Sequence, residues 1–272
     1  MKELTKEMIN DFEHYLFTGE KSPATIEKYI RDINFFNKYI NQQSSKTINK
    51  EVVISYKNFL IENEYKPRSI NSMLASLNSF FDFLGWHECK AKSIKLQQQI
   101  YCPAEKELSK GEYMRLLKTA ERKPKIWLIM QTICSTGIRV SELKYFTVEA
   151  VKNGEIFVNC KGKTRTILLP VKLKNKLLNY AKKYGIKKGI IFLNKKKEPI
   201  NRSTIWAWMK ELCKKAGVKA EKVFPHNLRK LFARTFYSME KDIAKLADIL
   251  GHSSINTTRI YIVSTGAEHR KK

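Results

Sequence analysis

The sequence predicts a mainly α-helical protein with one small β-sheet, an α+β fold in two domains. Apolar residues recur at helical spacing along most of the chain, and only one short stretch near residue 160 has the pattern of two strands joined by a tight turn. The helical periodicity fails between Trp86 and about Glu107, which indicates a domain boundary. The expected parts are a first domain over residues 1–96, a linker over 97–107 and a second domain over 108–272.

The first domain has the pattern of four short helices. The strongest pattern starts at Ser22, with Pro23 at the first helical position, and keeps its apolar spacing for about four turns. A second strong helix begins after Pro67 and ends at Gly85. Weaker helical patterns cover residues 4–17 and 51–61. Four helices with brief connections predict a small bundle.

The second domain alternates helices with one hairpin. Two β-rich runs, residues 154–160 and 164–170, flank Lys161-Gly162-Lys163, which predicts a β-hairpin with a basic turn. The expected helices cover residues 110–120 and 125–135, a short stretch after Arg139, and residues 172–184, 202–216, 227–239 and 242–250.

The basic residues are concentrated in the second domain. Residues 1–100 hold 14 Lys and Arg against 12 Asp and Glu, whereas residues 101–272 hold 38 against 14. Such an excess favours a polyanionic partner, because each cation that neutralises a phosphate releases condensed counterions. A Lys-rich solvated surface is the alternative, since Lys outnumbers Arg by 41 to 11.

Several classes of protein do not fit the composition. The longest apolar stretches, such as Ile126-Trp127-Leu128-Ile129-Met130, are far shorter than the roughly 20 residues of a membrane span, and the N-terminus is unlike a signal peptide. The five cysteines are scattered, so neither disulfides nor a zinc site is favoured. We therefore expect a cytoplasmic, nucleoid-associated protein with no metal, no cofactor and no membrane partner.

Three segments of the second domain combine residue types that serve phosphoryl chemistry. They are Thr136-Gly137-Ile138-Arg139-Val140-Ser141-Glu142-Leu143, Pro225-His226-Asn227-Leu228-Arg229 and Leu250-Gly251-His252, with Tyr261 nine positions after His252. Guanidinium groups bind phosphate oxygens with fork-shaped donors, imidazoles carry protons near neutral pH, and a tyrosine hydroxyl can act as a nucleophile. Any one of these segments alone is weak, because short spacings arise by chance.

With these segments in this order, the chain resembles the tyrosine recombinases of the phage-integrase and Xer type over essentially its whole length. The matching positions are Arg139, Lys161, His226, Arg229, His252 and Tyr261. The resemblance implies an N-terminal four-helix core-binding bundle of the SAM-like type and a C-terminal catalytic domain. It also implies cleavage and rejoining of DNA strands without water or metal, through a 3′-phosphotyrosine at Tyr261 and a released 5′-hydroxyl.

Each matched residue suits a step of that reaction. Arg139 and Arg229 neutralise the charge that the transition state places on the phosphate oxygens. Lys161, on the hairpin turn, donates a proton to the leaving 5′-oxygen. The nucleophile has an ordinary pKa near 10, so His226 is assigned to help it ionise. His252 donates a hydrogen bond to a phosphate oxygen.

Structural alternatives stand beside these roles. Arg139 and Glu142 are spaced to form a surface ion pair on a helix, although the flanking Thr-Gly and Ser favour the functional role for Arg139 and a buttressing role for Glu142. Lys161 lies in a Lys-rich chain, and Lys163 competes for the same assignment. We assign structural roles to the remaining histidines, His14, His87 and His269.

Ten further positions are expected to contact DNA. They are Thr25, Tyr29, Arg31, Arg68, Ser69, Asn71, Lys163, Arg165, Arg202 and Thr204. In the first domain the exposed helix face that carries Lys28, Arg31 and Lys38 is available to a DNA backbone, although exposed polar residues are ordinary there. Asn201 is adequately explained as a helix cap before Arg202.

The resemblance implies a site-specific recombinase that acts on double-stranded DNA at a core site with inverted-repeat arms. It implies self-association into a dimer and a tetramer and a Holliday-junction pathway. A type IB topoisomerase that relaxes DNA, and a non-catalytic DNA-binding accessory factor, are the alternatives. The charge distribution adds the expectation that the second domain makes most of the phosphate contacts.

Overall fold

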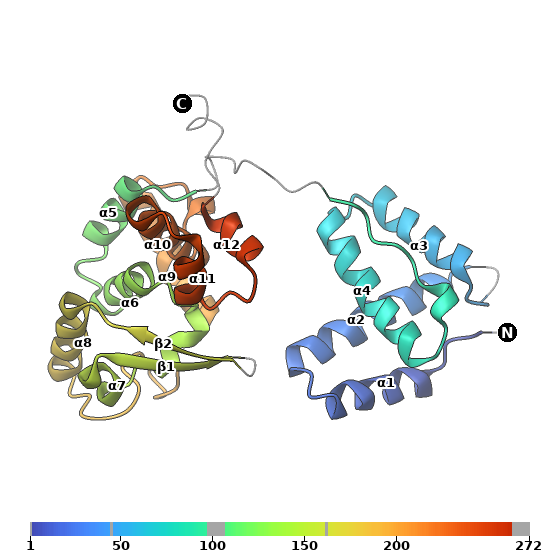
Figure 1. The fold of residues 1–272 in the computed structure, drawn as a ribbon, viewed down its shortest axis with the longest axis horizontal. Coiled ribbons are helices and arrows are strands. Elements are labelled where there is room, and N and C mark those ends of the chain that lie inside the picture. The colour runs from blue at the N-terminus through green and yellow to red at the C-terminus, as the bar shows by residue number, and fades with distance from the viewer. Residues whose placement is uncertain (1, 44–45, 97–106, 161–162, 263–272) are drawn as a thin grey trace. The chain divides into compact units, whose positions relative to one another are not determined.

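The computed structural model describes residues 2–43, 46–96, 107–160 and 163–262, with Cys160 and Lys163 described by their backbone alone. The chain divides into two compact units, Met1–Gln98 and Gln99–Lys272 (Figure 1). The expected linker, residues 97–107, lies almost wholly outside the described residues. The domain limits given above therefore stay predictions.

The first unit is a bundle of four helices. They are α1 (Lys6–Thr18), α2 (Pro23–Ile40), α3 (Lys50–Glu62) and α4 (Pro67–Phe83), followed by the short 3₁₀ helix η1 (His87–Cys89). The sequence sets three of the four starts, because the side chains of Thr5, Ser22 and Asn49 each accept a hydrogen bond from a backbone N–H of the first turn. The predicted four-helix bundle is confirmed.

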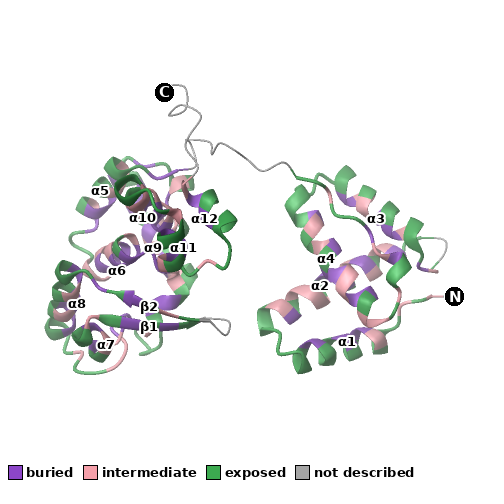
Figure 2. Ribbon diagram, viewed as in Figure 1, coloured by how far each residue is buried: buried purple, intermediate pink, exposed green. Residues whose placement is uncertain are grey.

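Aromatic side chains fill the centre of this bundle. Phe12, Phe36, Tyr56, Phe80 and Phe81 are fully buried. The rings of Phe36 and Tyr56 lie 4.9 Å apart and those of Phe12 and Phe80 lie 5.1 Å apart, both edge to face. Figure 2 shows the buried residues on the inward faces of the four helices, as the helical spacing predicts.

One charged group is buried between α2 and α4. Asp32 is 4% exposed and accepts hydrogen bonds from Lys28 Nζ at 2.7 Å and from Ser76 Oγ at 2.9 Å. The Lys28 ammonium also donates to the Ser72 carbonyl at 2.8 Å. Lys28 is thus turned toward α4 and is not available to a DNA backbone, contrary to the expectation from the sequence, because Asp32, Ser72 and Ser76 occupy its ammonium group.

Removing this carboxylate should loosen the first unit. We expect Asp32→Ala to lower its free energy of unfolding by about 2–3 kcal/mol, because the ammonium and the hydroxyl lose their common partner. Hydrogen–deuterium exchange of α2 and α4 in the full chain measures the change. Glu27→Ala, an exposed carboxylate on the same helix, is the control, and equal exchange in both variants would contradict the prediction.

The second unit consists of helices and one described hairpin that packs against them on one face. Its helices are α5 (Lys110–Thr119), α6 (Pro124–Thr136), α7 (Val148–Asn153), α8 (Val171–Lys183), α9 (Arg202–Ala216), α10 (Pro225–Glu240), α11 (Ile243–Leu250) and α12 (Ile255–Ile262). The 3₁₀ helices η3 (Val140–Tyr145) and η4 (Ala220–Lys222) lie between them. Strands β1 (Glu155–Cys160) and β2 (Lys163–Leu168) pair antiparallel in the register Phe157 to Thr166. The predicted α+β fold class is confirmed.

Helix α6 lies at the centre of the second unit. Ile129, Met130 and Ile133 are fully buried in its main core, and α10 packs along α6. The hairpin contributes Ile156 and Val158 to the same core, whereas Phe157 between them is exposed. This alternation is the period of two that the sequence of the strands predicts.

Two helices of the second unit were not expected from the sequence. Helix α7 has six residues and α12 has eight, too few for a helical period to stand out. The short helix expected after Arg139 is the 3₁₀ helix η3. Within the described residues no helix is long and apolar enough to cross a membrane, and no cluster of His, Cys, Asp or Glu could hold a metal ion.

Candidate active site

The turn after α6 places Arg139. Gly137 has φ +65°, and a Cβ atom there would lie 2.4 Å from Cδ1 of Phe232. Glycine therefore satisfies both the left-handed backbone and the close approach of α10. The chain leaves this turn extended at Arg139, the residue before η3. This is the physical reason for a Thr-Gly before the arginine.

Glu142 holds two arginines from inside the protein. It is 1% exposed, and its carboxylate accepts hydrogen bonds from the Arg139 backbone N–H at 2.7 Å and from Arg139 Nη1 at 3.0 Å. Arg165 on β2 donates to the same carboxylate at 2.6 Å and to the Ile249 carbonyl at 3.0 Å. Glu142 thus has the buttressing role that the sequence predicts, and it fixes Arg139 relative to the hairpin.

Arg229 on α10 is the largest fully buried side chain of the described residues, 1% exposed. Its Nη1 donates to the Gly137 carbonyl at 2.5 Å, and its Nη2 donates to the Leu250 carbonyl at 2.7 Å. Burial, and the nearby positive charge of Arg139, lower its pKa to about 10. The guanidinium is therefore still charged at neutral pH, and it joins the ends of α6 and α11.

His252 is already hydrogen-bonded on both ring nitrogens. Its Nε2 lies 3.0 Å from Arg229 Nη2, and its Nδ1 lies 2.9 Å from Thr258 Oγ1. Because a guanidinium can only donate, Nε2 accepts and Nδ1 carries the proton. The sequence predicts that His252 donates to a phosphate. In this structure Nε2 is an acceptor, so the prediction requires both that Nε2 gains a proton and that the hydrogen bond from Arg229 is broken.

Tyr261 lies between the two histidines. Its residue is 8% exposed, and its ring centroid is 5.1 Å from that of His226 and 4.9 Å from that of His252. The Arg229 guanidinium carbon is 5.8 Å from the same ring. Helix α12, which packs against α10 and α11, brings the tyrosine into this position.

The described part of the chain thus brings five of the six predicted catalytic residues into one cluster. They are Arg139, His226, Arg229, His252 and Tyr261. Lys161 lies outside the described residues. Sequence reasoning did not find Thr258, whose signal is its place in the Thr-Thr-Arg-Ile-Tyr stretch, or the Leu250 carbonyl, for which a sequence has no signal.

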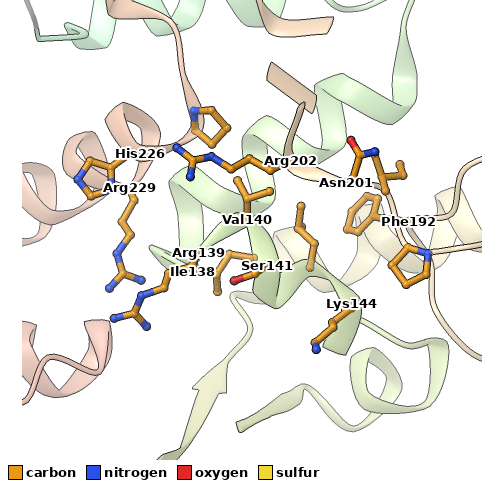
Figure 3. Close-up of a pocket in the computed structure, with 14 residues that line it drawn as sticks. Ile138, Arg139, Val140, Ser141, Lys144, Phe192, Asn201, Arg202, His226 and Arg229 are labelled. Carbon is orange, nitrogen blue, oxygen red and sulfur yellow. The ribbon is translucent and has the colours of Figure 1, made fainter. Parts of the chain in front are cut away.

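A cavity of about 520 Å³ opens beside this cluster (Figure 3). Arg139, His226 and Arg229 line it, with Arg202 extending toward His226, and Lys144 lines another part of it. Guanidinium and ammonium groups are the donors that proteins use for phosphate. This lining supports the binding of a phosphodiester, and two of its residues, His226 and Arg229, also contact the Tyr261 ring.

The predicted DNA contacts of the first unit fall into three groups. Arg31 and Ser69 line one cavity of about 380 Å³ between α2 and α4, and Arg68 is exposed beside it. Thr25 bonds Ser22 at the start of α2, and Tyr29 packs against the core. Two further predicted contacts, Asn71 in this unit and Arg165 in the second, have protein partners instead. The Asn71 amide pairs with both backbone groups of Ile94, and Arg165 is bound to Glu142.

Three predicted contacts besides Arg165 lie in the second unit. Arg202 and Thr204 are in the first turn of α9, which Asn201 caps with its side-chain oxygen. Arg202 is exposed and lines the cavity, whereas the Thr204 backbone N–H is used by the cap. Lys163 is the first residue of β2, and the structure describes its backbone but not its side chain.

Both histidines of the cluster should titrate in acid. Burial of the ring, and then the charges of Lys230, Arg229, Arg202 and Arg139, lower the pKa of His226 to about 4, although part of the residue stays exposed. Burial and the same kind of cationic surroundings lower the pKa of His252 to about 4. Both imidazoles are therefore neutral at pH 7, so neither ring carries a second proton there.

NMR titration of labelled histidines in the DNA-free chain checks this expectation. Two resonances should titrate with midpoints near pH 4, and His226→Gln and His252→Gln assign them. In the folded chain the pKa of each histidine lies below its ordinary value of 6.5, so as the pH falls the unfolded chain binds these protons first. The free energy of unfolding therefore falls as the pH drops from about 6.5 to about 4. Midpoints of 6 to 7 for both residues would contradict the assignment.

Comparison with known proteins shows the family to which this chain belongs. The sequence profile of the phage integrase family matches residues 106–268, and that of the phage integrase N-terminal SAM-like domain matches residues 9–88. The chain belongs to the phage integrase family. The resemblance found in the motifs is thereby confirmed, and so is the predicted enzyme class, the tyrosine recombinases.

Individual members of the phage integrase family match along the chain. Tyrosine recombinase XerA of Pyrococcus furiosus is 31% identical over 279 residues, covering 100% of this chain and 94% of XerA. Tyrosine recombinase XerH of Campylobacter jejuni is 34% identical over 140 residues, 49% of this chain and 40% of XerH.

Solved structures of the family share the fold. A crystal structure of XerA recombinase matches with a TM-score of 0.55 and 25% identity, over 98% of this chain and 97% of that one. A lambda integrase dimer bound to a COC′ core site matches with a TM-score of 0.73 and 20% identity, over 95% of each chain. The second likeness supports the fold alone.

Proposed function

We propose that this chain is a site-specific DNA recombinase whose nucleophile is Tyr261. The observation that carries the proposal is the position of the Tyr261 ring, between His226 and His252 and beside the buried Arg229. A guanidinium and two imidazoles around one tyrosine ring are more than packing requires, and they are the groups that phosphoryl transfer to a hydroxyl uses. The same proposal assigns residues 1–96 to DNA binding and residues 108–272 to catalysis.

The predicted catalytic residues account for each bond and each proton of the cleavage step. The Tyr261 oxygen forms a bond to phosphorus while the bond from phosphorus to the 5′-oxygen breaks. The phenolic proton passes to neutral His226, and Lys161 protonates the 5′-oxygen. Arg139 and Arg229 bind the non-bridging oxygens as their charge grows. Because a phosphodiester becomes a phosphotyrosyl diester, no water or cofactor is consumed, and the reverse step joins a 5′-hydroxyl to the same phosphorus.

We propose the oligomeric state of this chain on DNA by comparison with related recombinases. Lambda integrase has been solved as a dimer on a core site and as a tetramer on a Holliday junction, and XerH has been solved on its difH substrate. This chain would act in the same way, as a dimer on a core site with inverted-repeat arms and a tetramer on two sites. It would work on DNA in the cytoplasm, associated with the nucleoid.

A covalent selection tests the proposal and supplies the unknown target. The chain is incubated with a library of randomised duplexes that carry a nick, so that cleavage releases a short fragment and traps the adduct. Two copies of the selected sequence are then cloned in one plasmid. We expect recombination between the copies and no relaxation of a plasmid that lacks them. Relaxation of that second plasmid would favour a type IB topoisomerase, and DNA binding without adducts would favour an accessory factor.

A further inference from the structure

A second cavity lies next to the active-site cavity. It has a volume of about 520 Å³ and is lined by Arg202, Ser203, Trp206, Lys210, Glu221, Phe224 and Pro225. Arg202 and Pro225 line both cavities, and Pro225 directly precedes His226 in the first turn of α10. In Figure 3 the Arg202 side chain extends from α9 toward His226. The two cavities are therefore parts of one continuous surface.

An exposed indole forms a wall of this second cavity. The Trp206 residue is 48% exposed, whereas Trp208, two residues along α9, packs against the main core. The Lys210 ammonium lies 5.3 Å from the Trp206 ring centre and donates a hydrogen bond to the Ala220 carbonyl. The indole is thus held in place from the protein side, while it contributes little to the core.

We propose that Arg202 and Trp206 form a binding site for the DNA strand that flanks the scissile phosphate. In this site Arg202 binds the neighbouring phosphate, and the Trp206 ring packs on the adjoining deoxyribose. The site rests on the proposed function, which puts the scissile phosphate at Arg139 and Arg229. A strand that leaves those arginines on the α9 side meets Arg202 first and Trp206 next, because Arg202 lines both cavities.

Charge and shape identify the occupant as nucleic acid. Of the side chains that line the second cavity, Arg202 and Lys210 are cationic and Glu221 alone is acidic. In a duplex the bases are paired, so the groups that a backbone presents between its phosphates are the apolar C–H groups of the sugars. A flat ring beside a guanidinium offers a contact to each of these parts. The residue Trp206 therefore adds a contact that the motifs do not predict.

The first test measures DNA affinity in the Tyr261→Phe background, on a duplex selected for binding to that variant, so that cleavage plays no part. We expect Trp206→Ala to weaken binding of the selected target by about tenfold and Trp206→Phe, which keeps a flat ring, to retain most of the affinity. Trp127→Ala is the matched control, because Trp127 also lies under a lysine, Lys176 at 4.9 Å, but on α6. Wild-type affinity of Trp206→Ala, or an equal loss in Trp127→Ala, would overturn the proposal.

A second test locates the contact on the DNA. Replacing the phosphate next to the scissile one by a neutral methylphosphonate should weaken binding of the parent chain and have no further effect on Arg202→Ala. If the neutral phosphate weakens both proteins equally, Arg202 does not bind there, and the site is wrong. Absence of adducts with the wild-type chain would instead refute the proposed function, while these affinities are measured independently of cleavage.

Discussion

Replacing Tyr261 by phenylalanine should abolish the covalent protein–DNA adduct while leaving DNA affinity and the unfolding midpoint unchanged. The substitution removes one oxygen and keeps the ring that packs between His226 and His252. Tyr261 is only 8% exposed, so the packing of the phenylalanine ring at this position should still hold α12 in place. Without the hydroxyl no group at this position can form a bond to phosphorus.

The measurement is the denaturation-resistant band that the chain forms on a nicked target duplex. Tyr237→Phe is the matched control, because Tyr237 packs against the same small core cluster as Tyr261 and is not among the predicted catalytic residues. The control variant should form adducts at the wild-type rate. An adduct in Tyr261→Phe would show that the chemistry does not depend on this hydroxyl, and loss of the adduct in both variants would show that the effect comes from the packing of the cluster.

Replacing Arg229 by lysine should slow cleavage by about 10²–10³-fold, the loss that follows removal of one preorganised donor from a charged transition state. The guanidinium spans the Gly137 and Leu250 carbonyls and reaches His252. A lysine ammonium keeps the charge but cannot make this fork of contacts. We also expect lower thermal stability, because buried carbonyls lose a donor.

Single-turnover cleavage at saturating DNA separates this effect from binding. Arg234→Lys provides the control, since it makes the same change on the same helix at a residue paired with Glu107 and the Leu108 carbonyl. That variant should cleave at a rate close to that of the wild type. Equal rates for both variants would contradict a role for the Arg229 fork in the transition state.

The sequence predicted those parts of the fold that depend on local patterns. The helix starting at Pro23 is set by its own cap and by apolar residues one turn apart, and the hairpin by alternation around a glycine turn. Lys28 shows where local reasoning ends. Its direction depends on Ser72 and Ser76, which the periodicity of α2 cannot include.

The same limit applies to the candidate site. The resemblance supplied its residues, but not the state in which they are held. Arg229 donates a hydrogen bond to Nε2 of His252. It also donates to the carbonyl of Gly137, which lies 92 residues earlier in the chain. Such a contact depends on how α6, α10 and α11 pack, and no spacing within one segment records it.

Mass spectrometry of the trapped adduct tests the central claim most directly. Cleavage after Arg259 and Arg270 releases the peptide from Ile260 to Arg270, in which the side-chain hydroxyls are those of Tyr261, Ser264 and Thr265. We predict that the nucleotide remnant is attached through its 3′-phosphate to Tyr261. A remnant on Ser264, on Thr265 or on any other peptide would contradict the assignment of Tyr261 as the nucleophile.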